Sequence, residues 1–242
     1  KAVRAEAEER GLIAYDATCP LVTKVHIEVA KMRDAGMEII MIGHKGHPEV
    51  EGTMGQVESD HDEDDEVAAI GMYLVETPAD VAQLKVKNPD KLAFVTQTTL
   101  SMDDAATVIE ALKTKYPNIH APKSEDICYA TQNRQDAVKI MAPQVELVIV
   151  VGSPNSSNSN RLRELSEKLG IKSYMVDDPS QLDPAWFVGV RRVGLTAGAS
   201  APEALAQSII ARIKEFGPKQ VRSLEGVVES TVFALPKGLN VD

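Results

Sequence analysis

An internal repeat is the feature of this sequence that most constrains its fold. Two β-rich runs, MEIIMIG and VELVIVVG, end in Gly43 and Gly152, and each follows a helical pattern that begins just after a cysteine. Cys19 and Cys128 are 109 positions apart, and the two glycines are separated by the same number of positions. The chain therefore reads as two copies of one structural unit.

Each copy has the order of elements that is typical of parallel α/β folds. After each cysteine the pattern predicts a helix, a strand, a polar loop, a second helix, a second strand, a second polar loop and a third helix. The buried face of the first of these helices is predicted to consist of Val22, Val25, Val29 and Met32. Ligands of parallel sheets bind beyond the carboxyl ends of strands, so we expect HKGHPE, TQTT, SPNSSN and TAGAS to line a shared ligand site.

The register of the repeat changes in the second half of each copy. KLAFVTQTTLSMDDA resembles RRVGLTAGASAPEA, and this alignment pairs Thr96 with Thr196, a separation of 100 positions. The nine lost positions match the acidic stretch ESDHDEDDE (58–66), which is present only in the first copy. We interpret this stretch as a solvated loop insertion and assign it no role.

The polar loops have the chemistry of an anion site. SPNSSNSN places Ser156, Ser157 and Asn158 at a strand-to-helix turn, where side chains and free backbone N–H groups suit phosphate oxygens. TAGAS, which ends in Ser200, and the Thr98–Thr99 pair repeat this chemistry at corresponding strand ends. The alternative is that these side chains only cap helix N-termini. The recurrence of such polar loops at several strand ends favours anion binding.

Histidines and a carboxylate follow the first predicted strand. His44 and His47 form the one close histidine pair, and as hydrogen-bond donors they suit an anion. Glu49 lies two residues further on, and a carboxylate among anion-binding groups is costly unless it carries a proton, so we expect a general acid. His26 is expected on a helix and His120 in a loop, both without a role in the site.

Composition excludes several classes of protein. Aromatic residues make up 4% of the 242 residues and the net charge is −10, which argues against a surface for nucleic acid or an anionic membrane. No apolar run reaches the roughly 20 residues of a membrane span. Two cysteines do not form the disulfide framework of a small secreted domain, so we expect a cytoplasmic protein.

Six ordered motifs identify a family. DATCPLVTKVH, GHKGHPEVEGTMGQ, TQTTLS, DICYATQNRQ, VGSPNSSNSNRL and TAGASAP together resemble 4-hydroxy-3-methylbut-2-enyl diphosphate reductase, the LytB family. The resemblance runs from about residue 12 to the C-terminus. It implies the last step of the methylerythritol phosphate (non-mevalonate) route to isoprenoids, in which the substrate is converted to isopentenyl and dimethylallyl diphosphate. Two electrons and two protons remove the C4 hydroxyl as water.

The resemblance also implies a fold and a cofactor. The family is an α/β fold, a pseudo-threefold trefoil of three units around a central 4Fe–4S cluster. Three cysteines hold the cluster and leave one iron open to substrate, and ferredoxin or flavodoxin supplies electrons. We expect residues 1–18 to be a remnant of the first unit, 19–124 the second unit, 125–218 the third unit, and 219–242 a C-terminal tail.

Roles for individual residues follow from the same resemblance. Cys19 and Cys128 match two of the three cluster ligands. Glu49 matches the acid that delivers protons, and Thr98 the threonine bonded to it. The expected substrate contacts are His47, Thr98, Thr99, Ser156, Ser157, Asn158 and Ser200.

One part of the family pattern has no match. The third cluster cysteine and two further diphosphate-binding histidines are expected upstream of Cys19, and the chain begins with Lys1 within a helical pattern that Gly11 ends. We therefore expect a sequence that lacks its natural N-terminus. We also expect the 242 residues alone to bind a cluster poorly and to be inactive.

Two rival hypotheses remain from the residues themselves. In the first, the loops form a non-catalytic phosphate-binding module and the two thiols are structural. In the second, the two cysteines and the histidine pair bind zinc, although His44 and His47 have no tight spacing to either cysteine. Iron and sulfide content separates both from the cluster hypothesis.

Overall fold

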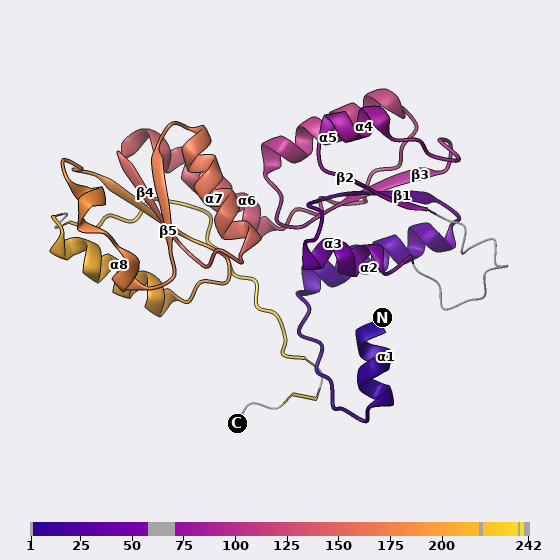
Figure 1. The fold of residues 1–242 in the computed structure, drawn as a ribbon, viewed down its shortest axis with the longest axis horizontal. Helices are drawn as coiled ribbons and strands as arrows, with labels where there is room; N and C mark the ends of the chain where they lie inside the picture. The colour runs from indigo at the N-terminus through magenta and orange to yellow at the C-terminus, as the bar shows by residue number, and fades with distance from the viewer. Residues whose placement is uncertain (1, 58–70, 218–219, 237, 240–242) are drawn as a thin grey trace. The chain divides into compact units, whose positions relative to one another are not determined.

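The computed structural model describes residues 2–57, 71–217, 220–236 and 238–239 (Figure 1). Its contacts divide the chain into two compact units. The first unit comprises Lys1–Thr98, Asp103–Asp126 and Ser230–Asp242, and the second comprises Thr99–Met102 and Ile127–Glu229. The predicted acidic insertion, 58–66, lies outside the described residues. The predicted boundaries at residues 18, 124 and 218 stay predictions, because contacts alone do not define family units.

The first unit contains a parallel three-stranded sheet in the order β2-β1-β3. Its strands are β1 (Glu38–Ile42), β2 (Met72–Val75) and β3 (Leu92–Thr96). The helices of this part of the chain are α1 (Ala2–Glu9), α2 (Pro20–Asp34), α3 (Pro48–Met54), α4 (Pro78–Gln83) and α5 (Met102–Lys115). Helices α2 and α3 cover one face of the sheet, and α4 and α5 cover the other (Figure 1).

The second unit repeats this arrangement in the order β5-β4-β6. Its strands are β4 (Leu147–Val151), β5 (Lys172–Val176) and β6 (Val193–Ala197). Its helices are α6 (Tyr129–Met141), α7 (Ser157–Lys168) and α8 (Glu203–Glu215), with short 3₁₀ turns at Ala142–Gln144, Pro179–Gln181 and Pro184–Phe187. α6 and α7 pack on one face of the sheet, and α8 packs on the other (Figure 1).

Both central strands are completely buried, as near-continuous apolar runs in parallel sheets require. The predicted buried face of α2 is confirmed at Val25 and Val29, which are fully buried, while Val22 and Met32 are half-buried. The predicted helix stop at Gly11 is also confirmed, since this glycine has a φ of 65° just after α1.

Two details of the predicted repeat are wrong. Each sheet has three strands where the sequence pattern predicted two, because β2 and β5 are edge strands that are only partly buried. The second-half alignment is also shifted by one residue. Ile42 pairs with Thr96, and its equivalent Val151 pairs with Ala197, so Thr96 corresponds to Ala197 and not to Thr196. A one-residue shift matters because it would turn every side chain to the opposite face of the strand.

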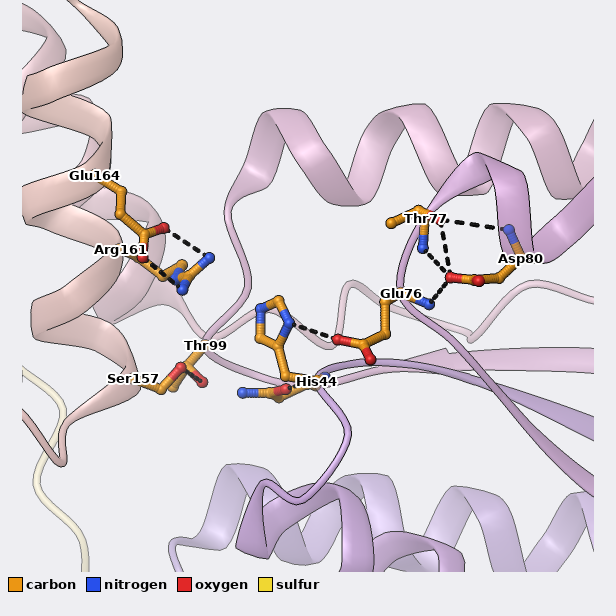
Figure 2. A network of polar contacts seen from close by, with 9 residues as sticks. His44, Glu76, Thr77, Asp80, Thr99, Ser157, Arg161 and Glu164 are labelled. Carbon is orange, nitrogen blue, oxygen red and sulfur yellow. Dashed lines mark hydrogen bonds and ion pairs between the residues drawn. The ribbon is translucent and has the colours of Figure 1, made fainter.

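Proline and capping residues determine where several helices begin. α2, α3 and α4 each start with proline, whose fixed φ and missing N–H suit the first turn of a helix. Thr77 and Asp80 form a reciprocal capping box at α4 (Figure 2). None of the helices in the described part of the chain is long and apolar enough to cross a membrane.

Candidate active site

The polar loops follow the carboxyl ends of strands in both units, as predicted. In the first unit, residues 43–47 connect β1 to α3, and Gln97 and Thr98 follow β3. In the second unit, residues 152–156 connect β4 to α7, and residues 198–202 connect β6 to α8. Each unit therefore presents two polar loops at the sheet edge where α/β proteins bind ligands.

Glu49 and Thr98 form a closely bonded pair in the first unit. The Thr98 backbone N–H donates to Glu49 Oε1 at 2.7 Å, and Thr98 Oγ1 donates to Glu49 Oε2 at 3.0 Å. Burial raises the pKa of the Glu49 carboxyl, the two bonds from Thr98 oppose that rise, and the charge of Asp126 adds to it. The net pKa is raised, which suits a carboxyl that donates a proton near neutral pH.

His47 occupies the N-cap of α3, two residues before Glu49. Its Nδ1 accepts a hydrogen bond from the Glu49 backbone N–H at 3.2 Å. Burial lowers the pKa of His47, and the nearby His44 lowers it further. Because Nδ1 accepts this hydrogen bond, the proton of the neutral ring lies on Nε2, which remains a donor for an anion.

The first polar loop is anchored by two residues that the sequence patterns did not indicate. The His44 backbone N–H donates to the Oε1 atom of fully buried Gln97 at 3.0 Å. The His44 ring contacts Glu76 through Nδ1 at 3.2 Å (Figure 2). Gln97 directly follows β3, so its position between a buried strand and a threonine pair is the signal that could have identified it.

In the second unit, Ser156 caps α7 and Ser157 lies in its first turn. Ser156 Oγ accepts from the Ser159 backbone N–H at 3.3 Å. Thr99 Oγ1 donates to Ser157 Oγ at 3.0 Å (Figure 2). Ser200 is exposed in the loop after β6. The hydroxyls of Ser156, Ser157 and Thr99 lie at the N-terminus of α7, where an anion is favoured by the helix dipole.

Asn158 is buried, and both the oxygen and the nitrogen of its amide are hydrogen-bonded. Its Oδ1 accepts from the Ala199 backbone N–H at 3.0 Å, and its Nδ2 donates to Thr131 Oγ1 at 3.2 Å. In the first unit, Glu49 occupies the equivalent position and accepts from the Thr98 backbone N–H in the same way. The repeat thus places an amide where the other copy has a carboxyl.

The two cysteines also occupy equivalent positions, the N-caps of α2 and α6. Cys19 is exposed, and Cys128 is partly buried. Cys128 Sγ accepts from the Thr131 backbone N–H at 3.3 Å and lies 3.0 Å from Thr131 Oγ1. Free thiols at helix N-termini with N–H donors are suited to act as thiolate ligands. No group of three His, Cys, Asp or Glu side chains within the described residues is gathered into a metal site.

Asp126 is a further buried carboxylate that the sequence patterns did not indicate. Its Oδ2 accepts from the Thr96 backbone N–H at 3.0 Å, and its Oδ1 lies 3.7 Å from Lys24 Nζ. Burial raises the pKa of Asp126 to about 6. Asp126 therefore anchors the last residue of β3, Thr96, two residues before Thr98.

Comparison with known proteins decides which family has this arrangement. A family model described as "LytB protein" matches residues 1–214. The chain belongs to the LytB family. Known LytB relatives include a 4-hydroxy-3-methylbut-2-enyl diphosphate reductase of Burkholderia mallei, which is 65% identical over all of this chain and 71% of its own length. The corresponding reductase of Ralstonia nicotianae is 63% identical, again over all of this chain and 71% of its own length.

Solved LytB structures agree with the fold. A diphosphate reductase from Plasmodium falciparum superposes with a TM-score of 0.87 at 36% identity, covering 98% of this chain and 71% of that chain. A second reductase, described as the terminal enzyme of the non-mevalonate pathway, gives a TM-score of 0.54 at 32% identity, covering 88% of this chain and 72% of that chain. The predicted α/β trefoil class and the predicted family are both confirmed. The roles of the individual site residues stay predictions.

Proposed function

We propose that the protein containing this sequence reduces (E)-4-hydroxy-3-methylbut-2-enyl diphosphate to isopentenyl and dimethylallyl diphosphate, because its LytB relatives are named as reductases of this diphosphate. The observation that supports this most directly is the Glu49–Thr98 pair, a carboxyl with a raised pKa at the carboxyl edge of a parallel sheet. The phosphate-binding module does not account for such a proton donor, and the comparisons do not favour it.

A 4Fe–4S cluster, as the LytB family implies, fits the two thiols. We propose Cys19 and Cys128 as two of its ligands, because both thiols are free and both occupy N-cap positions that are equivalent in the repeat. The sequence holds no third cysteine. When bound, the cluster supplies the two electrons of the reduction, which ferredoxin or flavodoxin would deliver to it. Thiols that must stay reduced also agree with a cytoplasmic location.

The residues of the chain itself bind the substrate and move its protons. Hydroxyls at Ser156, Ser157 and Ser200 and the Nε2–H of His47 would hold the diphosphate with neutral donors. Glu49 would hold a proton on its carboxyl and deliver it to the leaving hydroxyl, which departs as water. Thr98 keeps both carboxylate oxygens of Glu49 in place through two hydrogen bonds.

Anaerobic turnover measurements on protein from the full open reading frame that contains this sequence test the proposal. We expect iron, sulfide and substrate reduction in the wild type, and a loss of roughly 10²–10⁴-fold in kcat for Glu49→Gln at unchanged iron content. Iron-loaded wild-type protein that does not reduce the substrate would refute the function. A Glu49→Gln variant that retains full kcat would refute the role of Glu49.

A further inference from the structure

Thr131 contacts the sulfur of Cys128 in two ways. It lies in the first turn of α6, three residues after Cys128, and it is completely buried. Its backbone N–H donates to Cys128 Sγ at 3.3 Å, and its Oγ1 lies 3.0 Å from the same sulfur. Both polar groups of this one residue therefore point toward the thiol.

The direction of the hydroxyl bond follows from its other neighbour. The Ala199 backbone N–H can only donate, so the atom of the Asn158 amide that it contacts at 3.0 Å must be the oxygen. The amide nitrogen of Asn158 then faces Thr131 Oγ1 at 3.2 Å and donates to it. A threonine hydroxyl carries a single hydrogen. Because Oγ1 accepts from Asn158, its own hydrogen is left for Cys128 Sγ.

These bonds connect two elements of the proposed site within the second unit. Cys128 at the start of α6 is the proposed cluster ligand, and Asn158 in the first turn of α7 belongs to the loop proposed to bind diphosphate. A buried, fully bonded chain of polar groups holds its members in one geometry more firmly than separate pairs do. Thr131 therefore connects the Cys128 thiol to residues 156–158, the segment proposed to bind diphosphate (the anion loop).

The other copy of the repeat lacks this link. Val22 occupies the position equivalent to Thr131, 109 residues earlier, and no side-chain capping bond to Cys19 is present in the described part of the chain. Valine has the same branched shape as threonine but no hydroxyl. The fold therefore accommodates valine at this position of the unit, and the hydroxyl is a feature of the second copy alone.

We propose that Thr131 is a positioning residue that hydrogen-bonds the Cys128 sulfur in the reduced enzyme and holds Asn158 for diphosphate binding. This inference rests on the proposed function. Hydrogen bonds to cysteine sulfur stabilise the more negative, reduced state of an iron–sulfur cluster and so raise its reduction potential. The hydroxyl of Thr131 would thus make the cluster easier to reduce, while its oxygen orients the amide of the anion loop.

Thr131→Val and Thr131→Ser in the iron-loaded protein test this role. We expect Thr131→Val to lower the reduction potential in an anaerobic titration followed by visible absorbance, and to weaken binding of inorganic diphosphate by about tenfold, the effect of one lost hydrogen bond. Thr131→Ser keeps the hydroxyl and should restore both values. Thr53→Val is the matched control, because Thr53 is a buried helical threonine whose hydroxyl has no partner among the described residues.

The outcomes separate this inference from the proposed function. A Thr131→Val protein that is folded and iron-loaded but has the wild-type potential and diphosphate affinity would overturn the role of Thr131. A lowered potential in a protein that does not reduce the substrate would support Thr131 and refute the proposed function. A wild-type protein that takes up no iron would overturn both.

Discussion

Glu49 combines burial with two hydrogen bonds that act on its pKa in opposite directions. Burial raises the pKa, and the bonds from Thr98 lower it. Thr98→Val removes the hydroxyl donor to Oε2 and leaves the backbone donor to Oε1 in place. The pKa of Glu49 should therefore rise further, because the ionised form loses a partner.

The expected result is a displaced pH profile of kcat. If Glu49 acts as an acid, activity falls as the pH rises through its pKa, so Thr98→Val should move this falling limb to higher pH while lowering the maximum rate by about tenfold. Thr107→Val is the control, since Thr107 is an exposed helical threonine that bonds only locally, to the Asp104 carbonyl at 2.7 Å. A limb that stays in place would mean that another group donates the proton.

Glu38, at the start of β1, is a buried carboxylate with a structural role. It accepts hydrogen bonds from the Tyr73 hydroxyl and from the backbone N–H groups of Lys87 and Asn88. Burial raises its pKa, but these bonds together lower the pKa by more, and the net value lies below the usual range. A folded-state pKa below the unfolded one stabilises the protein above the unfolded pKa of about 4.3, and this stabilisation is lost as the pH falls through the folded value.

Glu38→Gln should therefore reduce the free energy of unfolding at pH 7 by roughly 1–3 kcal/mol, because the backbone donors lose a charged partner. The difference in the free energy of unfolding between the variant and the wild type should shrink as the pH approaches 3. Urea unfolding of both proteins at each pH measures it. Glu146→Gln is the comparison, since Glu146 accepts from the backbone N–H groups of Arg191 and Arg192 at an exposed site and should contribute less. An equal difference at pH 7 and near pH 3 would contradict the structural role of the Glu38 carboxylate.

At the scale of elements, α7 approaches its sheet too closely for any side chain at Gly152. A Cβ built on Gly152 would lie 2.1 Å from Ser159 Oγ, and one on Gly198 would lie 2.2 Å from the same atom. Two loops and the first turn of α7 therefore meet at one serine. The position of the anion loop depends on the absence of these two side chains.

Gly152→Ala should displace the N-terminus of α7 and destabilise the second unit by about 1–3 kcal/mol, as overpacking does. The Michaelis constant for the diphosphate substrate should rise with it, because Ser156 and Ser157 lie in this turn. Gly226→Ala is the control, since nothing lies within 4 Å of a Cβ built there. Thermal unfolding and steady-state kinetics measure the two effects, and a Gly152→Ala variant that is stable with an unchanged Michaelis constant would refute this packing argument.

Some of these helices and strands could be predicted from the sequence, and others could not. The buried valines of α2, the central strands β1 and β4 and the polar loops at their ends follow from periodicity and composition, and the structure confirms them. The edge strands β2 and β5 are only partly buried, so they carry no clear alternating or apolar signal. Gln97, Asp126 and Thr131 were missed because their burial and bonding depend on segments distant in sequence.

At the scale of the whole molecule, the two units are not successive stretches of chain. Ser230–Asp242 group with the first unit, although the second unit ends at Glu229. A protein that ends at Glu229 would keep the 3.0 Å ion pair between Glu229 and Arg134 and so the second unit's own contacts. Any faster hydrogen exchange in this shortened protein should therefore be confined to the first unit, with nearly unchanged exchange in β4–β6. Uniform acceleration of both sheets would contradict the division into units.

This discontinuity has a consequence for the order in which the protein is made. A ribosome makes the chain up to residue 126 long before Ser230, so the first sheet can form early, but the contacts that group Ser230–Asp242 with the first unit form only after that segment has been made. The second unit, by contrast, is nearly continuous in the chain and can complete itself as it emerges. Of these two units, the one that lies earlier in the chain is therefore completed later, and a copy that stops before Ser230 would lack the contacts of this segment with the first unit.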